Sequence, residues 1–418
     1  MQNHPAHQEP RRVLGSFFAP KSQNTPTWEQ RKLGDAFERV VRKNTNNESR
    51  LPLTISAQDG LVDQITYFNN RVASRDVSNY YLVYNGEFAY NKSTSDGYPF
   101  GAVKRLDWYE KGVLSTLYIV FALKHLEKDD SDFMTVFYDT DRWHRGVAER
   151  AAEGARNHGL LNISADDFFD IDTTMPEDKA EQEKIGRLLK KLDTLITLHQ
   201  RKYEKLVNIK KSMLDKMFPK NGASVPEIRF KGFTDPWEQR KLKELYFQLT
   251  ERNTDLLPYQ KTLSVATMSF KTDGNGAADT SLANYKRLRT GDIAFEGHTS
   301  KEFRYGRFVL NDVGDGIMSP RFSALRPLHE MPINFWKYYI HYEPIMRKVL
   351  VNSTKAGTMM NELVINDFLQ GSILVPSMTE QQAIGRFFKQ LDTLITLHQR
   401  KLEKLQNIKK SCLEKMFV

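Results

Sequence analysis

The sequence predicts a mixed α/β protein with two globular bodies, separated by two long helices that form an antiparallel coiled coil. Three observations predict this fold class. Residues 181–218 and 380–417 are identical at 29 of 38 positions, at a constant offset of 199. The hexapeptide Trp-Glu-Gln-Arg-Lys-Leu begins at Trp28 and again at Trp237. Between each hexapeptide and its helix lie about 150 residues whose two versions differ. The chain is therefore a pseudo-two-fold symmetric internal repeat in which one scaffold carries two different surfaces.

The repeat divides the chain into five predicted segments. These are an atypical leader at residues 1–26, a first body at 27–176, a central spacer helix at 177–220, a second body at 221–376 and a C-terminal spacer helix at 377–418. A length of 418 residues agrees with two or three domains. The hydrophobic content of 40% is enough for a core in each body.

The compartment can be predicted from what the sequence lacks. No apolar run approaches the roughly 18 residues that a membrane helix needs. The apolar stretch after Arg11 and Arg12 is too short for an export signal. Cys412 is the single cysteine, which excludes an internal disulfide and fits a reducing compartment. We therefore expect a cytoplasmic protein with no membrane partner.

Both repeats are predicted to be helices of about 60 Å, because neither contains proline and each contains one glycine. Apolar residues recur at alternating steps of three and four, as in a coiled coil. The predicted helix-pairing residues are Ile185, Leu188, Leu192, Leu195, Leu206 and Ile209 in the first helix, and Ile384, Phe387, Leu391, Leu394, Leu405 and Ile408 in the second. His199 and His398 lie in the same seam. We expect them to set the register, with metal binding as the alternative.

A second apolar row widens the stripe beyond that of a two-helix seam. It consists of Leu189, Ile196, Tyr203 and Met217. We therefore expect the helices also to cover a body or to dock another subunit. Because each body begins and ends near its own helix, antiparallel pairing places one body at each end of the rod. That arrangement suits the two-fold character of duplex DNA.

Both bodies are predicted to be rich in short strands. In the second body the candidate strands are 261–268, 286–295, 305–310, 317–325 and 371–375, with a short helix around 333–342. The first body follows a similar order: Gly101 corresponds to Gly306, and Gly112 to Gly316. The two bodies are therefore expected to share one fold and to differ in their loops, where recognition usually resides.

The net charge of +9 is concentrated in the two helices, which carry +5 and +4. The bodies are neutral in aggregate, so DNA binding would require their basic residues to be segregated on one face. Arginine can bind guanine bidentately, whereas lysine and serine can hold phosphates. The loop candidates are Lys92, Ser93, Lys104, Arg105, Arg156 and His158 in the first body, and His298, Ser300, Lys301, Arg304, Arg307, Arg321, Lys355 and Thr358 in the second. Any one of them could instead be an ordinary surface residue.

Several enzyme signatures are missing from the sequence. There is no Gly-x-x-x-x-Gly-Lys-Ser/Thr phosphate loop, no Asn/Asp-Pro-Pro-aromatic tetrapeptide and no zinc-binding spacing. One acidic cluster invites the alternative of a magnesium-dependent, site-specific nuclease that acts as a single chain: Asp170, Asp172, Glu177 and Lys179. However, acidic residues are favoured at a helix start in any case, and the second repeat has Ser377 and Thr379 instead. We therefore expect no catalytic residue and no metal site.

Taken together, these motifs resemble the DNA-specificity subunit of bacterial type I restriction-modification systems. The resemblance covers nearly the whole chain. It is carried by the Pro-Trp-Glu-Gln-Arg-Lys-Leu opener, by Gly-Asp-Ile-Ala-Phe at 291–295 and by the twin Glu-Gln-x-x-Ile-Gly helices that end in Asn-Ile-Lys-Lys-Ser.

The resemblance implies a non-catalytic subunit in which two target-recognition domains each bind half of an asymmetric bipartite DNA site. The paired helices would fix the unspecific gap between the halves. It also implies two methyltransferase subunits that carry S-adenosylmethionine, and two restriction subunits that carry ATP. We expect no cofactor in this chain, and S-adenosylmethionine, ATP and Mg²⁺ in its partners.

The chain departs from the family at one place. The second body is introduced by Val225–Phe233, which resembles the family's usual start, whereas the first body is preceded by the unrelated leader, residues 1–26. This departure concerns the N-terminal edge of the first body.

Overall fold

The computed structural model describes residues 27–56, 59–151, 159–220, 222–271, 279–358 and 360–417. The leader, residues 1–26, lies outside this range. The chain divides into two compact units: unit 1 comprises Met1–Leu198 and Glu403–Val418, and unit 2 comprises His199–Leu402. Each unit contains one body and a segment of each long helix. No helix in the described part of the chain is long and apolar enough to cross a membrane.

Unit 1 is built on a four-stranded antiparallel sheet in the order β2-β9-β6-β7. Its strands are β2 (Phe37–Arg39), β9 (Ile119–Leu123), β6 (Phe88–Asn91) and β7 (Ala102–Arg105). Because side chains alternate along a strand, Phe88 and Tyr90 enter one core with Phe121, while Ala89 enters a second core on the opposite face. Both faces of the sheet are therefore buried.

Shorter elements surround this sheet. They are β1 (Trp28–Lys32), α2 (Leu33–Ala36), β3 (Leu53–Ser56), β4 (Gly60–Asp63), α3 (Gln64–Phe68), β5 (Tyr81–Tyr84), β8 (Lys111–Leu114), α4 (Ser131–Phe137), α5 (His144–Arg150), α6 (Ala165–Phe169) and β10 (Asp172–Pro176). Strand β1 pairs antiparallel with β10, so the opener hexapeptide lies beside the strand that leads into the long helix.

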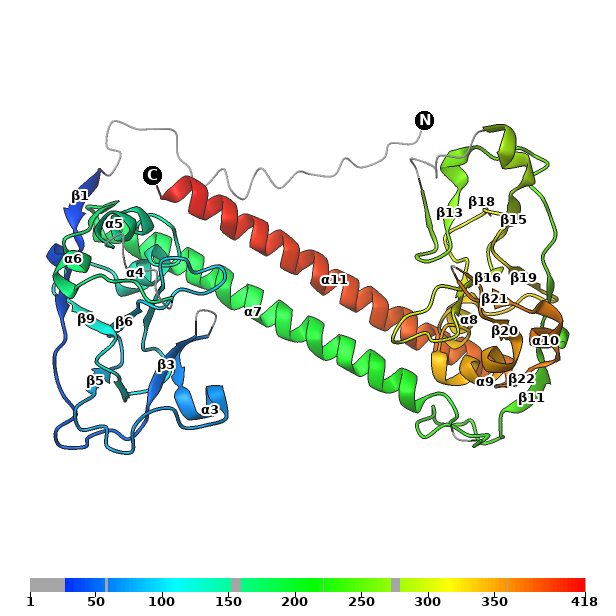
Figure 1. Cartoon of the computed structure of the whole chain (residues 1–418), viewed down its shortest axis with the longest axis horizontal. Helices are drawn as coiled ribbons and strands as arrows, with labels where there is room; N and C mark the ends of the chain where they lie inside the picture. Colours follow the sequence, from blue (N-terminus) through cyan, green and yellow to red (C-terminus); the bar gives the residue numbers. More distant parts are fainter. Residues whose placement is uncertain are drawn as a thin grey trace. The chain divides into compact units, whose positions relative to one another are not determined.

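Unit 2 repeats this topology, with a sheet in the order β12-β19-β16-β17. Its strands are β12 (Tyr246–Gln248), β19 (Ala324–Pro327), β16 (Ile293–Glu296) and β17 (Arg307–Leu310). Phe295 enters the larger core and Ala294 the smaller one, as Tyr90 and Ala89 do in unit 1. The prediction that both bodies share one fold is therefore confirmed (Figure 1).

The remaining elements of unit 2 show where the sequence prediction needs correction. They are β11 (Glu238–Lys241), η1 (Leu242–Glu244), η2 (Tyr259–Lys261), β13 (Leu263–Ser264), β14 (Ser269–Phe270), η3 (Asp279–Asn284), β15 (Lys286–Leu288), β18 (Gly316–Met318), α8 (Ile333–Tyr339), α9 (Glu343–Ser353), β20 (Thr354–Lys355), β21 (Glu362–Leu363), α10 (Ile365–Gln370) and β22 (Ser372–Val375). The candidate strand 286–295 is two strands, because Gly291 has a positive φ and the Asp292 carboxylate accepts the backbone N–H of Arg289 in a tight turn.

Two long helices complete the units: α7 (Lys179–Lys216) and α11 (Met378–Met416). In unit 1, the Trp28 indole N–H donates a hydrogen bond to Glu181 near the start of α7, and the Trp28 ring contacts Phe417 just after the end of α11. Asp193 of α7 forms an ion pair with Lys409 of α11 at 2.6 Å. The residue number thus rises along α7 as it falls along α11. In unit 2, His199 faces His398 and Lys210 pairs with Asp392 at 2.6 Å, in the same sense. The predicted antiparallel pairing is confirmed (Figure 1).

The predicted pairing residues are mostly buried or half-buried. Ile185, Leu192, Ile384 and Leu391 are buried; Leu188, Leu195, Leu206, Ile209, Phe387, Leu405 and Ile408 are half-buried. Leu394 differs, because its side chain is 43% exposed. The equivalent Leu195 of α7 is half-buried, so the two copies of the repeat differ at this position. Leu189 and Met217 of the second row pack into the body cores, as expected.

Gly186 and Gly385 are the positions where each body approaches its helix most closely. A Cβ at Gly186 would lie 2.6 Å from the backbone nitrogen of Phe133, and one at Gly385 would lie 2.7 Å from that of Phe335. Such distances are shorter than real Cβ contacts, and the neighbouring atoms are backbone. The single glycine in each helix therefore permits helix-to-body packing.

We expect Gly186→Ala and Gly385→Ala each to lower the free energy of unfolding. Alanine gains about 1 kcal/mol in helix propensity over glycine, but overpacking costs about 1–3 kcal/mol, so the net loss should be at most about 2 kcal/mol. Chemical denaturation measures it. Thr194→Ala, at an exposed position of α7, is the control and should be neutral or slightly stabilising. A more stable Gly385→Ala protein would contradict close packing.

The histidine pair makes the helix contact of unit 2 sensitive to pH. The Nδ1 atoms of His199 and His398 are 2.8 Å apart, so one ring donates an N–H and the other accepts it. Burial, the facing His398 and the charges of Lys401 and Lys202 lower the pKa of His199 below its ordinary value. Below a pH of about 6.5 the unfolded chain therefore binds more protons than the folded one.

We expect the unfolding midpoint to fall as the pH drops below about 6.5, because a lowered histidine pKa stabilises the fold only above that range. The measurement is thermal unfolding at pH 5.5 and 7.5. The double variant H199L/H398L should show a smaller difference between these two values. Identical pH dependence in the two proteins would show that this contact does not respond to protonation.

Candidate nucleic-acid interface

Two loops of unit 2 lie against each other and bring together six of the eight residues predicted for the second body. The first, Gly297–Gly306, connects β16 to β17, and the second, Thr354–Leu363, contains β20 and β21. Asn361 joins them: its backbone N–H donates to the Gly297 carbonyl at 2.9 Å and its side chain donates to the Arg304 carbonyl at 3.4 Å. A Cβ at Gly297 would collide with the Asn361 carbonyl oxygen, so glycine permits this approach. We call these two loops the paired-loop edge of unit 2.

Unit 1 builds the same feature from a different sequence. Its loop Lys92–Gly101 follows β6 and lies against Gly159–Leu161. The Thr94 N–H donates to the Gly159 carbonyl at 2.7 Å, and the Leu161 N–H donates to the Lys92 carbonyl at 3.0 Å. Gly101 and Gly306 close the first loop in their respective units, and both have φ near +80° (76° and 81°), which favours glycine. We call these segments the paired-loop edge of unit 1.

The edge of unit 2 presents exposed cations. Lys301, Arg304 and Lys355 are all exposed, as are Ser300 and Thr358. His298 is 53% exposed in its side chain and is held in place by Glu296. The buried Glu296 carboxylate lies 2.5 Å from His298 Nδ1 and also accepts the His298 backbone N–H at 3.1 Å. This leaves Nε2 of the ring for contacts outside the protein.

Two predicted residues of unit 1 have a structural role instead. Lys104 forms an ion pair with Asp139 at 2.7 Å. Arg105 donates to Asp107 at 2.6 Å and to Asp132 at 2.8 Å, with only 10% of its side chain exposed. Burial opposes the charge of Arg105, but the two carboxylates raise its pKa above the ordinary value. Lys104 and Arg105 thus fasten β7 to other elements.

The other predicted residues fall in several places. In unit 1, Ser93 is exposed on the edge and Lys92 is half-buried, with its ammonium donating to the Ile163 carbonyl at 3.3 Å. In unit 2, Arg307 donates to the Ala266 carbonyl at 2.9 Å and stacks over Phe303. Arg321 is exposed in the turn after β18, over the ring of Phe322. Arg156 and His158 lie outside the described residues.

Asn361 and Glu296 are positioning residues that the sequence prediction missed. Neither is basic, so a search for phosphate-binding side chains passes over them. Glu296 follows the Gly-Asp-Ile-Ala-Phe motif directly and precedes Gly297. That position, at the end of a buried strand and before a glycine, is the one signal that could have identified it.

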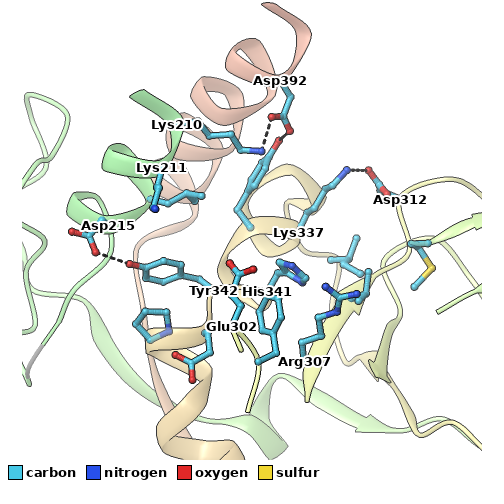
Figure 2. A pocket seen from close by; sticks show the side chains of 18 of the residues that line it. Lys210, Lys211, Asp215, Glu302, Arg307, Asp312, Lys337, His341, Tyr342 and Asp392 are labelled. Carbon is cyan, nitrogen blue, oxygen red and sulfur yellow. Dashed lines mark hydrogen bonds and ion pairs between the residues drawn. The ribbon is translucent and has the colours of Figure 1, made fainter. Parts of the chain in front are cut away.

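A cavity of about 830 Å³ lies in unit 2 between the end of α7, α8 and α11 (Figure 2). Several of its polar side chains bond one another. Tyr338 donates to Asp392 at 2.5 Å and Tyr342 donates to Asp215 at 3.0 Å. Burial, and then the neighbouring carboxylate, raises the pKa of both phenols. His341 Nδ1 lies 3.0 Å from the Phe308 carbonyl, and burial lowers the pKa of the ring. These bonds attach the body to the helices of its unit.

The acidic cluster is held by neighbouring side chains. Asp170 forms ion pairs with Lys32 and Arg150, and Glu177 accepts the Thr27 hydroxyl at 2.7 Å. Lys179 donates to the Leu126 carbonyl at 2.7 Å. Within the described residues, no group of three or more histidine, cysteine, aspartate or glutamate side chains could hold a metal ion.

Each unit thus contains one copy of the same α/β body with its own paired-loop edge, packed on its own segments of α7 and α11. The chain's second half can be assigned more closely. Residues 235–407 match the model of the type I restriction modification DNA specificity domain. The second half of the chain therefore carries this domain, which confirms the resemblance that its motifs indicated.

Three solved structures are similar to this chain. The type I restriction-modification S subunit from M. genitalium has a TM-score of 0.55 at 14% identity, and the match covers 96% of this chain and 98% of that chain. The HsdS subunit from Thermoanaerobacter tengcongensis matches with a TM-score of 0.43 at 16% identity, over 93% of this chain and 96% of that one. A chain from a structure on the complex assembly and conformational transition of the type I R-M system matches with a TM-score of 0.45 at 14% identity. This match covers 95% of this chain and 99% of that chain. The first of these likenesses supports the fold.

Proposed function

We propose that this chain is the non-catalytic DNA-recognition subunit of a type I restriction-modification complex. Each body, acting as a target-recognition domain, would bind one half of an asymmetric bipartite site. The observation that carries the proposal is the paired-loop edge, which the same scaffold builds twice from unrelated loop sequences. Binding two different half-sites requires two domains with the same sheet and different loops at the binding edge.

The chemistry of the unit 2 edge suits DNA. Lys301 and Lys355 are exposed ammonium groups that can neutralise phosphates, which positions the protein without specifying sequence. Arg304 can donate two hydrogen bonds to a guanine in the major groove. His298, oriented by Glu296, presents Nε2 for a further base or phosphate contact. The edge thus offers both positioning and sequence-dependent contacts.

The helix pair would act as the ruler between the two half-sites. Helices α7 and α11 have 38 and 39 residues, and a helix rises about 1.5 Å per residue. A pair of helices of this length would let each body engage its own half-site while the intervening base pairs remain unspecified. The domain boundaries predicted from the sequence fit this division of labour.

Catalysis would reside in partner subunits. We infer that two methyltransferase subunits, which hold S-adenosylmethionine, and two restriction subunits, which hold ATP and Mg²⁺, assemble on this chain in the cytoplasm. Exposed apolar residues of the long helices support docking of a partner. Leu198 is 43% exposed in unit 1, and Leu394 and Leu397 are 43% and 45% exposed in unit 2. The alternative, a single-chain nuclease, has less support because Asp170 and Glu177 are engaged by neighbouring side chains.

The experiment selects binding sites from a randomised duplex library, using the chain in complex with a methyltransferase subunit. The sites selected by the wild-type chain are compared with those selected by its variants. We expect the triple variant K301A/R304A/K355A to lose selection of the second half-site and to keep the first. Each lost phosphate contact should reduce the salt slope of binding by about 1, and loss of the arginine–base pair should cost about 1–3 kcal/mol.

The matched control is K231A/K243A/K348A, which removes the same charge from exposed positions of unit 2 outside the edge. It should select the wild-type sites. If both triple variants weaken binding equally and neither changes the selected sequence, the edge is not a recognition surface. Mg²⁺-dependent cutting by the isolated chain would instead support the nuclease.

A further inference from the structure

In unit 2, a segment that precedes the opener clamps the two long helices together. Arg229 donates from Nε and from one terminal nitrogen to the two carboxylate oxygens of Glu380, each at 2.7 Å. The Glu380 side chain is 1% exposed beneath it. The backbone N–H of Ile228 donates to the Lys216 carbonyl near the end of α7, at 2.9 Å. We call residues 225–233 the docked segment.

An apolar contact accompanies this ion pair. The ring of Phe230 lies 5.9 Å from that of Phe387, edge to face. The docked segment thus uses three features of the helices: a carboxylate near the start of α11, an apolar residue two turns further along, and a backbone carbonyl at the end of α7. A bidentate pair between arginine and carboxylate is among the stronger hydrogen-bonded contacts in proteins.

The offset of 199 gives the equivalent positions in unit 1, which are Glu181, Leu188 and Lys415. All three features recur there. Leu188 is half-buried, and Lys415 is the penultimate residue of α11. The Trp28 indole N–H donates to one oxygen of Glu181 at 3.3 Å. The other oxygen, Oε2, is buried and has no hydrogen-bond partner among the described residues.

This carboxylate is an unusual feature, because a buried ionised oxygen normally has a donor. Burial raises the pKa of Glu181, as expected for a carboxyl group with too few donors. The equivalent Glu380 has an arginine on both oxygens. The two units therefore present the same receiving surface, and in unit 2 an arginine of the preceding segment binds to it.

The sequence that precedes Trp28 indicates the occupant in unit 1. Residues 1–26 contain two arginines, Arg11 and Arg12, followed by Val13 and Leu14. The described chain begins at Thr27, whose hydroxyl donates to Glu177, two residues before the start of α7 and four before Glu181. Thr27 therefore lies beside the receiving surface, and the leader sequence that precedes it contains two arginines, whose guanidinium groups are the usual partners of a carboxylate.

We propose that Glu181, Leu188 and Lys415 form a docking surface for an arginine-containing segment, and that the leader supplies this segment through Arg11 or Arg12. The unrelated leader would then perform in unit 1 the task of the docked segment in unit 2. A guanidinium at Glu181 would donate to both carboxylate oxygens, as Arg229 does to Glu380 in unit 2.

The test is the rate at which trypsin cleaves after residues 11 and 12 in the full chain, followed by mass spectrometry. Each rate is divided by the rate for a free peptide of residues 1–26 with the same sequence. Docking should slow cleavage about tenfold, the effect of one charge-assisted pair. The variant R11K/R12K keeps both cleavage sites and loses bidentate geometry, so most of this protection should disappear.

Substitutions of the carboxylates separate docking from general effects. Glu181→Gln should abolish the protection. In that background, the wild-type leader and the R11K/R12K leader should have equal normalised cleavage rates. Glu183→Gln, on the same helix but with exposed partners Lys179 and Arg187, should leave it intact. Equal normalised rates in wild type and in R11K/R12K would overturn the proposal. So would protection that survives Glu181→Gln, since the leader would then dock elsewhere.

Discussion

The structure of each unit depends on the antiparallel contact between α7 and α11. Asp193 with Lys409 in unit 1, and Asp392 with Lys210 in unit 2, are the same ion pair at the two equivalent places of the repeat. Their side chains are partly exposed, so each pair contributes modestly to stability. Each pair mainly sets the register, because it favours one alignment of the two helices. Most of the stabilisation comes from the apolar residues buried beside it.

Each body is fixed to this helix pair by packing that tolerates little change. Gly186 and Gly385 let α4 and α8 approach the helix backbone, and β10 and β22 lead directly into α7 and α11. Asp132 also fixes the body to the helix, because its carboxylate forms ion pairs with both Arg105 of β7 and Lys190 of α7. The loops are outside this framework. They can therefore differ between the bodies without disturbing the cores, which is the condition for a reusable recognition scaffold.

The sequence predicted the helices and their pairing well, because a duplicated heptad pattern is a strong and local signal. Its loop candidates included Lys301, Arg304 and Lys355 of the paired-loop edge of unit 2, but it did not predict that the two loops contact each other. It did not foresee the ion pairs of Lys104 and Arg105, whose partners Asp139 and Asp132 are about 30 residues away and could not be assigned from composition. It also missed α9, where Pro344 in the first turn starts a second helix after Tyr342, and it joined strands that the Asp292 turn separates.

The central claim is that the helix pair sets the distance between two independent recognition surfaces. The most direct measurement is the methylome of a host that expresses a methyltransferase subunit with this chain, compared with the chain after insertion of one heptad behind Gln200 and one behind Gln399. Seven residues lengthen a helix by about 10 Å, so the gap of the methylated motif should grow by up to about three base pairs. Both half-site sequences should stay the same. An unchanged gap with active methylation would contradict the account.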